Sequence, residues 1–183
     1  MDIIKRLFSK PTKTAGGSTV QKYVPSEKPP KLGFTSAPAE WKELRENQYR
    51  KWLGDSEKAF VWHEIVPIIP HVDIHVFPPS KELGRNYFTL VTSGMSDEKM
   101  ILPKGIDKQF ARAEIIFYIA NDESKTYQTN KPWYVEAMSF YAHFPFDYKT
   151  WLASSHTLPN GNPPAPVVDD SSLTTALFLP TSV

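Results

Sequence analysis

Apolar residues recur with helical spacing over residues 38–53. The stripe repeats every three or four residues, as one face of an α-helix does, and its members are Trp41, Leu44, Gln48 and Trp52, with Tyr49 and Leu53 beside them. Pro38 suits the first turn of a helix, and Gly54 suits its end. We therefore predict a helix over residues 38–53 whose stripe, tryptophans included, faces the core.

Stretches rich in β-branched and aromatic residues predict strands. Four of them precede residue 120, at 59–66, 71–77, 87–92 and 112–119. The run 115–119 shows no alternation of apolar and polar residues, which is typical of a central strand covered on both faces. A proline-rich loop at 159–171 then leads to a further predicted strand at 173–179.

A second helix is predicted to begin at Pro132 and to run to about Tyr141. Phe144-Pro145 is expected to end it, because the residue before a proline avoids the helical conformation. Its apolar side comprises Trp133, Ala137, Phe140, Tyr141 and Phe144. Helices before and after a group of strands predict an α+β fold, with a mixed β-sheet flanked by helices.

Charge divides the chain unevenly. Residues 1–35 carry seven Lys and Arg against Asp2 and Glu27, a net charge of +5, whereas the other 148 residues carry 14 against 18, a net charge of −4. The first segment also contains Gly16-Gly17 and four prolines, and such a composition buries too little apolar surface to order itself. We expect a flexible basic leader over residues 1–36 and one domain over 37–183, and the acidic domain argues against nucleic-acid binding.

Composition excludes several classes of protein. The chain has no cysteine, so disulfides, cysteine nucleophiles and thiolate metal sites are excluded. Its 17 prolines argue against a helical bundle. No apolar run approaches the ~20 residues of a membrane helix, and the start of the chain does not read as a secretory signal. We therefore expect a cytoplasmic protein that contacts no membrane.

His71, Asp73 and His75 alternate along a predicted strand, so their side chains share one face. They are ligand types of a divalent-metal site, and His63 could lie on the adjacent strand. A metal- or acid/base-dependent hydrolase on this face is the alternative function. We favour a polar sheet face without metal or cofactor, because true metal sites usually draw ligands from several segments.

No complete catalytic motif is present. The segment 93–97 lacks the flanking glycines of a nucleophile elbow. Gly94 ends the predicted strand 87–92 and is expected in a tight turn with positive φ. Ser96 and Asp97 are expected to cap a following turn. Arg112 and Glu114 share a strand face, which predicts an ionic network between strands rather than catalysis.

Several segments together, in their order along the chain, resemble those of one known family. The central one is YFTLVTSGMSDEKM at residues 87–100. The others are His63-Glu64-Ile65 and 71–78 before it, and 112–118, Phe144-Pro145, 150–152 and 156–161 after it. The family that they resemble is the suppressor-of-fused domain family, and the resemblance covers roughly residues 37–180. The short length and the Gly-Met-Ser-Asp segment look like the bacterial branch. Because family members continue with more strands, this chain is expected either to be a short or truncated member or to have its last strand at the edge of a sheet.

The resemblance implies an interaction domain rather than an enzyme. In animals the suppressor-of-fused protein sequesters a transcription factor by gripping a short peptide as an added strand. Bacterial relatives are thought to act as immunity proteins that block a toxin. We therefore expect a protein partner, for example a cognate toxin. The residues expected to contact it lie at the glycine turn and the histidine-bearing strand: Asp73, Gly94, Met95, Ser96 and Asp97.

Overall fold

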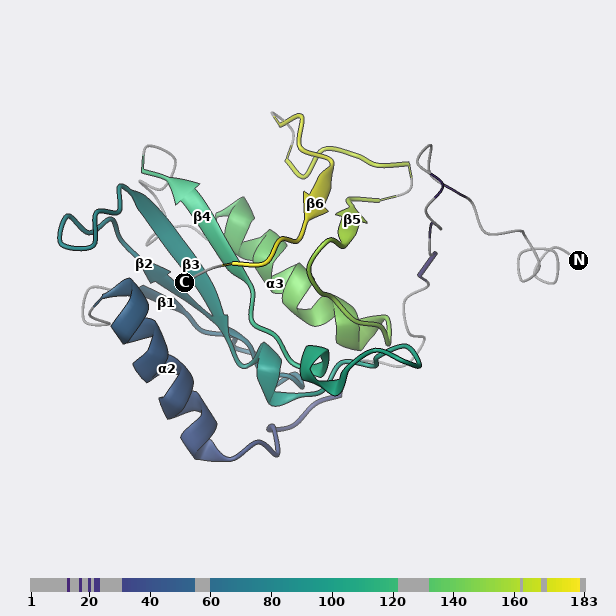
Figure 1. The fold of residues 1–183 in the computed structure, drawn as a ribbon, viewed down its shortest axis with the longest axis horizontal. Helices are drawn as coiled ribbons and strands as arrows, with labels where there is room; N and C mark the ends of the chain where they lie inside the picture. The colour runs from purple at the N-terminus through teal and green to yellow at the C-terminus, as the bar shows by residue number, and fades with distance from the viewer. Residues whose placement is uncertain are drawn as a thin grey trace, which may run out of the picture.

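The computed structural model describes residues 13, 17, 20, 22–23, 31–54, 60–121, 132–161, 163–168 and 171–181. Within them, a four-stranded sheet has one helix on each face, and a two-stranded sheet lies beside it (Figure 1). The elements are α2 (Ala39–Leu53), β1 (Phe60–Trp62), β2 (Asp73–Phe77), β3 (Tyr87–Ser93), β4 (Ile116–Ala120), α3 (Trp133–Asp147), β5 (Thr157–Pro159) and β6 (Thr175–Leu177), with 3₁₀ turns η2 (Met95–Asp97) and η3 (Lys108–Ala111). The predicted α+β fold is confirmed.

The larger sheet has the order β1-β2-β3-β4, and every pairing in it is antiparallel. Its strands follow one another in chain order, so no crossover connection is present to produce the parallel pairs of the expected mixed sheet. Four strands are shorter than predicted, namely those expected at 59–66, 71–77, 112–119 and 173–179. β3 extends one residue beyond its predicted range.

β4 is an edge strand, which corrects the prediction that it is central. Side chains of its uninterrupted apolar run nevertheless pack against clusters on both faces of the sheet. Ile116 packs in the cluster under α2, and Phe117 and Ile119 pack in the cluster under α3. Tyr118 remains half exposed.

The α3 face holds the main core. Its fully buried side chains come from the sheet and from the helix, and include Val76, Leu90, Val135 and Met138. α3 passes through Pro145 to Asp147, so the prediction that Phe144-Pro145 ends it is wrong. A proline one turn from the end removes a single helical hydrogen bond, and the chain turns away only after Tyr148 N donates to Phe144 O. Neither helix of the described residues is long and apolar enough to cross a membrane.

α2 turns a different stripe to the sheet from the one predicted. Leu44 and Trp52 are 65% and 40% exposed, so their expected burial is wrong. Instead Arg45, Tyr49 and Leu53, spaced by four residues, face inward. The polar contacts of the first two, described below, set the rotation of the helix. Gly54 ends α2 as predicted, with φ 95° and its N–H bonded to Arg50 O.

Part of the expected leader contacts the domain. The Tyr23 ring lies edge-on to Phe144 at 5.3 Å, and Thr150 Oγ1 donates to its hydroxyl at 3.2 Å. Leu32 forms a β-bridge with Ile68. Ordered contacts therefore begin before the predicted boundary at residue 36, and most of residues 1–30 lie outside the described residues.

Candidate functional site

The turn after β3 requires glycine. Gly94 has φ 122°, as predicted for a tight turn. A Cβ at this position would lie 2.0 Å from the backbone oxygen of His71, which is far inside van der Waals contact. The close approach joins the end of β3 to the segment entering β2, so the glycine turn and the histidine-bearing strand are neighbours.

Glu114 anchors this turn from inside the protein. Its Oε1 accepts hydrogen bonds from Gly94 N at 3.1 Å, Ser96 N at 3.0 Å and Ser96 Oγ at 2.6 Å. Its Oε2 accepts one from Thr92 Oγ1 at 2.6 Å. Burial raises the pKa of Glu114, and the hydrogen bonds from Ser96 and Thr92 oppose that rise. Ser96 therefore bonds a buried carboxylate instead of capping a turn.

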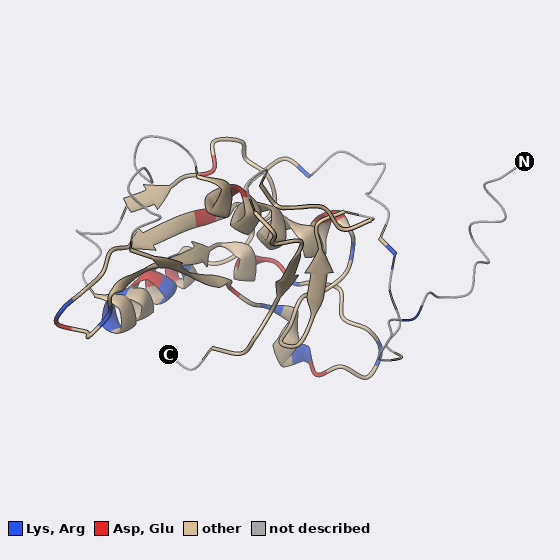
Figure 2. Ribbon diagram, turned by 90° about the horizontal axis from the view of Figure 1, so that it is seen from above, with Lys and Arg blue, Asp and Glu red and all other residues tan. Residues whose placement is uncertain are grey.

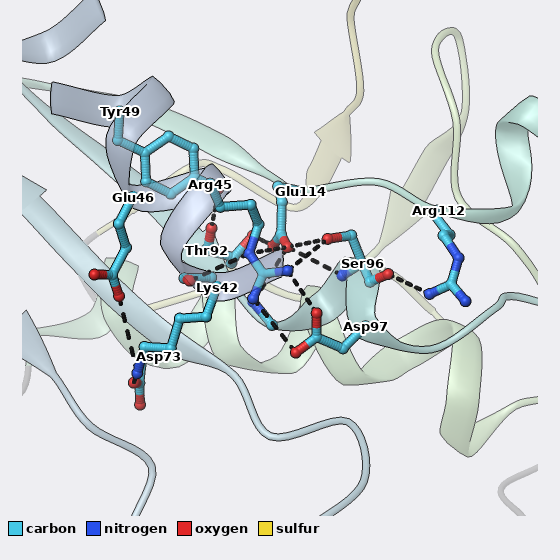
Figure 3. A network of polar contacts seen from close by, with 12 residues as sticks. Lys42, Arg45, Glu46, Tyr49, Asp73, Thr92, Ser96, Asp97, Arg112 and Glu114 are labelled. Atoms are coloured by element: carbon cyan, nitrogen blue, oxygen red, sulfur yellow. Dashed lines mark hydrogen bonds and ion pairs between the residues drawn. The ribbon is translucent and has the colours of Figure 1, made fainter. Parts of the chain in front are cut away.

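Two arginines tie α2 and the segment before β4 to the same turn (Figure 3). Arg45 of α2 forms an ion pair with Asp97 at 2.5 Å, and its Nε lies 3.5 Å from Glu114 Oε1. Arg112 donates to Ser96 O and lies over the Trp41 ring, 4.7 Å from its centroid. The predicted ionic network exists, but it joins Glu114 and the glycine turn to Arg45 of α2 rather than joining two strands.

Asp73 is the centre of a second polar cluster. Its Oδ2 lies 3.2 Å from His63 Nδ1 and 3.4 Å from Lys42 Nζ, while Oδ1 accepts a hydrogen bond from Glu64 N at 3.2 Å. His71 Nε2 lies 3.4 Å from Oδ1. Burial raises the pKa of Asp73, but the hydrogen bonds from Glu64 N and His63 outweigh it, so the pKa lies below its ordinary value.

Glu64 and His143 extend this cluster across the sheet to α3. Glu64 Oε2 accepts a hydrogen bond from Val72 N at 3.0 Å, and Oε1 lies 2.8 Å from His143 Nε2. Sequence reasoning missed this pair because its members are 79 residues apart and on different elements. Within the described parts of the chain, no group of three or more His, Asp or Glu side chains is arranged to hold a metal ion.

His75 faces α2. Its ring stacks on Phe77 with centroids 6.4 Å apart and lies edge-on to Tyr49 at 6.1 Å. Its Nε2 is buried without a hydrogen bond, 3.9 Å from Glu46 Oε1. Burial lowers the pKa of His75. The three residues of the alternative metal set thus do not converge on one point, and absence of a bound metal stays a prediction.

The residues expected to contact a partner are mostly interior. Asp73 and Met95 are 3% and 1% exposed, and Gly94 is buried. Ser96 and Asp97 are partly exposed, but their side chains bond Glu114 and Arg45. These residues shape the turn from within, and a direct contact with a partner stays a prediction.

A groove of about 740 Å³ runs between β4 and the C-terminal segment. Side chains of β4, α3 and residues 173–181 line it, including Phe117, Trp133, Tyr141, Leu177 and Phe178. Most of the lining is apolar, and Leu177 and Leu179 are 58% and 68% exposed. Sequence reasoning missed this groove because the apolar run of β4 was interpreted as a fully covered central strand.

Outward-facing backbone groups of β4 border this groove. Thr92 N donates to Ile115 O at 3.0 Å, which makes Thr92 and Ile115 a hydrogen-bonded pair. Since such pairs alternate in antiparallel sheets, Phe117 and Ile119 bond β3, while Ile116 and Tyr118 direct their N–H and C=O outward. Within the described residues β4 pairs with β3 alone.

Comparison with known proteins gives one match. The family model described as suppressor of fused protein matches residues 69–182, more than half of the chain. The matched range covers β2 to β6, and therefore includes the glycine turn, Asp73, Glu114 and the groove, whereas α2 and β1 lie before it. No curated protein and no solved structure matches the chain.

Proposed function

The chain belongs to the suppressor-of-fused family, and we propose that it binds a partner protein by holding an extended segment of that partner along the outer edge of β4. The family suggests a protein-interaction module. The observation that carries the choice of surface is the outer edge of β4 beside the apolar groove, with which no strand of the described residues pairs.

The groove offers both parts of strand recognition. The outward N–H and C=O groups of Ile116 and Tyr118 supply main-chain hydrogen bonds to an added strand. The apolar side chains of α3 and β6, with Trp133 and Leu177 among them, supply contacts for alternate side chains of the bound segment. Backbone pairing gives affinity, and these contacts give selectivity.

We propose that binding sequesters or neutralises the partner without turnover. A cognate toxin of a bacterial immunity system, met in the cytoplasm, is the partner that the family resemblance favours. The two polar clusters support a binding role, because their carboxylates are occupied within the fold. Glu114 receives four hydrogen bonds, and Asp73 contacts His63, His71 and Lys42.

Capture from the native cell tests the proposal. The chain serves as bait, and Leu177→Lys places a charge in the groove, whereas Tyr118→Pro removes an outward N–H that an edge strand does not need. Leu44→Lys is the matched control, because Leu44 is a similarly exposed leucine on α2.

We expect both groove variants to weaken capture of the same protein by at least about tenfold, as loss of a central contact does, and the control to bind like the native chain. If both groove variants fold and still capture the partner as the native chain does, the partner binds at another surface. Turnover of a substrate that these variants abolish would contradict the non-catalytic role.

A further inference from the structure

We propose that residues 179–181 form a strap that closes over the outer edge of β4 and opens when a partner binds. The inference rests on the proposed function of this edge and adds its regulation. Figure 1 shows the chain leaving β6 and running back toward the four-stranded sheet. The contacts on either side of the strap establish its path.

Before the strap, the chain lies on the α3 side of the sheet. Phe178 packs edge-on against Tyr141 of α3, with ring centroids 5.6 Å apart. Its backbone is held on both sides, because Phe178 N donates to His156 O and Ser155 N donates to Phe178 O. These contacts fix the position of Phe178, the residue directly before the strap.

At its last residue, Thr181, the strap reaches the α2 side. Thr181 Oγ1 lies 3.1 Å from the hydroxyl of Tyr118. Tyr118 shares a strand face with Ile116, which packs under α2, and its ring lies edge-on to Tyr87 at 5.3 Å. Three extended residues span about 10 Å, which is enough to pass from one face of a strand to the other. Leu179 and Pro180 must therefore cross the edge of β4.

The strap itself is held weakly. For residues 179–181, the bond to Tyr118 is the one hydrogen bond in the described part of the chain. It is exposed to solvent, and Leu179 is 68% exposed. An exposed hydrogen bond contributes little, so an incoming strand displaces this segment easily while Phe178 stays anchored.

The position of the strap has two consequences. It shields a free strand edge, which natural proteins protect from unwanted pairing, and Pro180 offers no N–H for pairing. It also competes with any segment that pairs with Tyr118. Closure therefore lowers the apparent affinity for a partner by the fraction of molecules that are closed.

A double-mutant cycle tests closure through affinity. Tyr118→Phe and Thr181→Val each remove one side of the bond and keep the shape of the side chain. Using the partner protein captured by the bait, we expect each variant to bind about two- to tenfold more tightly, the ratio that one hydrogen bond corresponds to. The double variant should bind no more tightly than either single one. Tyr87→Phe, on the neighbouring ring, should bind like the native chain.

A spin label on Leu179→Cys reads the strap directly, because the chain contains no other cysteine. With no further change in the chain, we expect the label to be immobilised. Its mobility should increase in the Tyr118→Phe variant and on addition of the partner. A mobile label in the chain without partner, or an immobilised label in the bound complex, would contradict the strap proposal and leave the proposed function intact. If Leu177→Lys and Tyr118→Pro left the affinity for the partner unchanged, that result would instead contradict the proposed function.

Discussion

The two helices cover opposite faces of one sheet with different chemistry. α3 carries two charged residues in its 15 positions and buries seven side chains, Met138 and Val135 among them. α2 also has 15 residues, but seven are charged and only Tyr49 and Leu53 are buried. Figure 2 shows residues of both signs along α2.

The difference separates stability from positioning. Apolar contacts under α3 are non-directional, and their contribution grows with the area buried. Under α2, Tyr49 OH donates to Thr92 O at 2.7 Å, and Arg45 pairs with Asp97. Buried polar pairs contribute little net stability but require one geometry. We infer that the α3 face holds the fold together, while the α2 face fixes where the glycine turn lies.

The largest effect should come from the α3 face. Met138 is fully buried, so Met138→Ala should destabilise the protein by about 2–5 kcal/mol through lost burial and a cavity. Phe140→Ala is the control, because Phe140 is 47% exposed and should cost much less. Urea unfolding measures both variants. Equal losses would mean that α3 does not bury the face described.

A smaller but still large effect should come from the glycine turn. Gly94→Ala combines a positive φ with a backbone clash and should cost about 3 kcal/mol. Gly84→Ala separates the two causes, since Gly84 has φ 62° with open space at its Cβ. It should cost about 1–2 kcal/mol. A Gly94 variant no less stable than the Gly84 variant would show that the approach to His71 is not tight.

The same comparison explains what could be predicted from sequence. Apolar spacing, prolines and glycines are local signals, and they located both helices, the strands of the main sheet and the positive φ of Gly94. The stripe of α2 that faces the sheet is not a local property. Arg45 and Tyr49 find their partners 52 and 43 residues away, so apolar spacing alone pointed to Leu44 and Trp52.

The groove was unpredictable for a related reason. An apolar run such as 115–119 shows that both faces of a strand are covered, but it carries no information about strand order. The edge position of β4 depends on β5 and β6 forming a separate sheet. The contact of Glu64 with His143 likewise depends on the packing of α3 against the sheet.

Acid should weaken the α2 face before the α3 face. Burial lowers the pKa of His75 below its ordinary 6.5, so the unfolded chain binds more protons than the folded one. Stability is then full above pH 6.5 and is lost as the pH falls from 6.5 toward the folded pKa, by at most about 1.4 kcal/mol per pH unit. The charged groups facing the ring are Glu46, Asp73, Lys42 and His63.

His75→Phe tests this pH dependence, because it keeps a ring against Phe77 and removes the titration. Urea midpoints at pH 7.5 and 5.5 should differ less for the variant than for the native chain. The lowered pKa of Asp73 acts only below 3.8, and the raised pKa of Glu114 affects both proteins alike. An unchanged pH dependence in the variant would assign the acid sensitivity to other groups.

The smallest effect should come from the exposed end of the polar face. Lys42 lies 3.4 Å from Asp73, but its side chain is 55% exposed, so Lys42→Ala should cost less than about 1 kcal/mol. Asp97→Ala should cost about 1.5–3 kcal/mol, because the Arg45–Asp97 pair is about one-tenth exposed. Salt should separate the two substitutions further, because at 1 M the Debye length falls to about 3 Å. High salt should abolish the stability loss of Lys42→Ala and leave most of the loss of Asp97→Ala. Urea unfolding of both variants in low and high salt measures this, and an equal loss of the two effects would show that the Arg45 pair is no better shielded from water than the lysine.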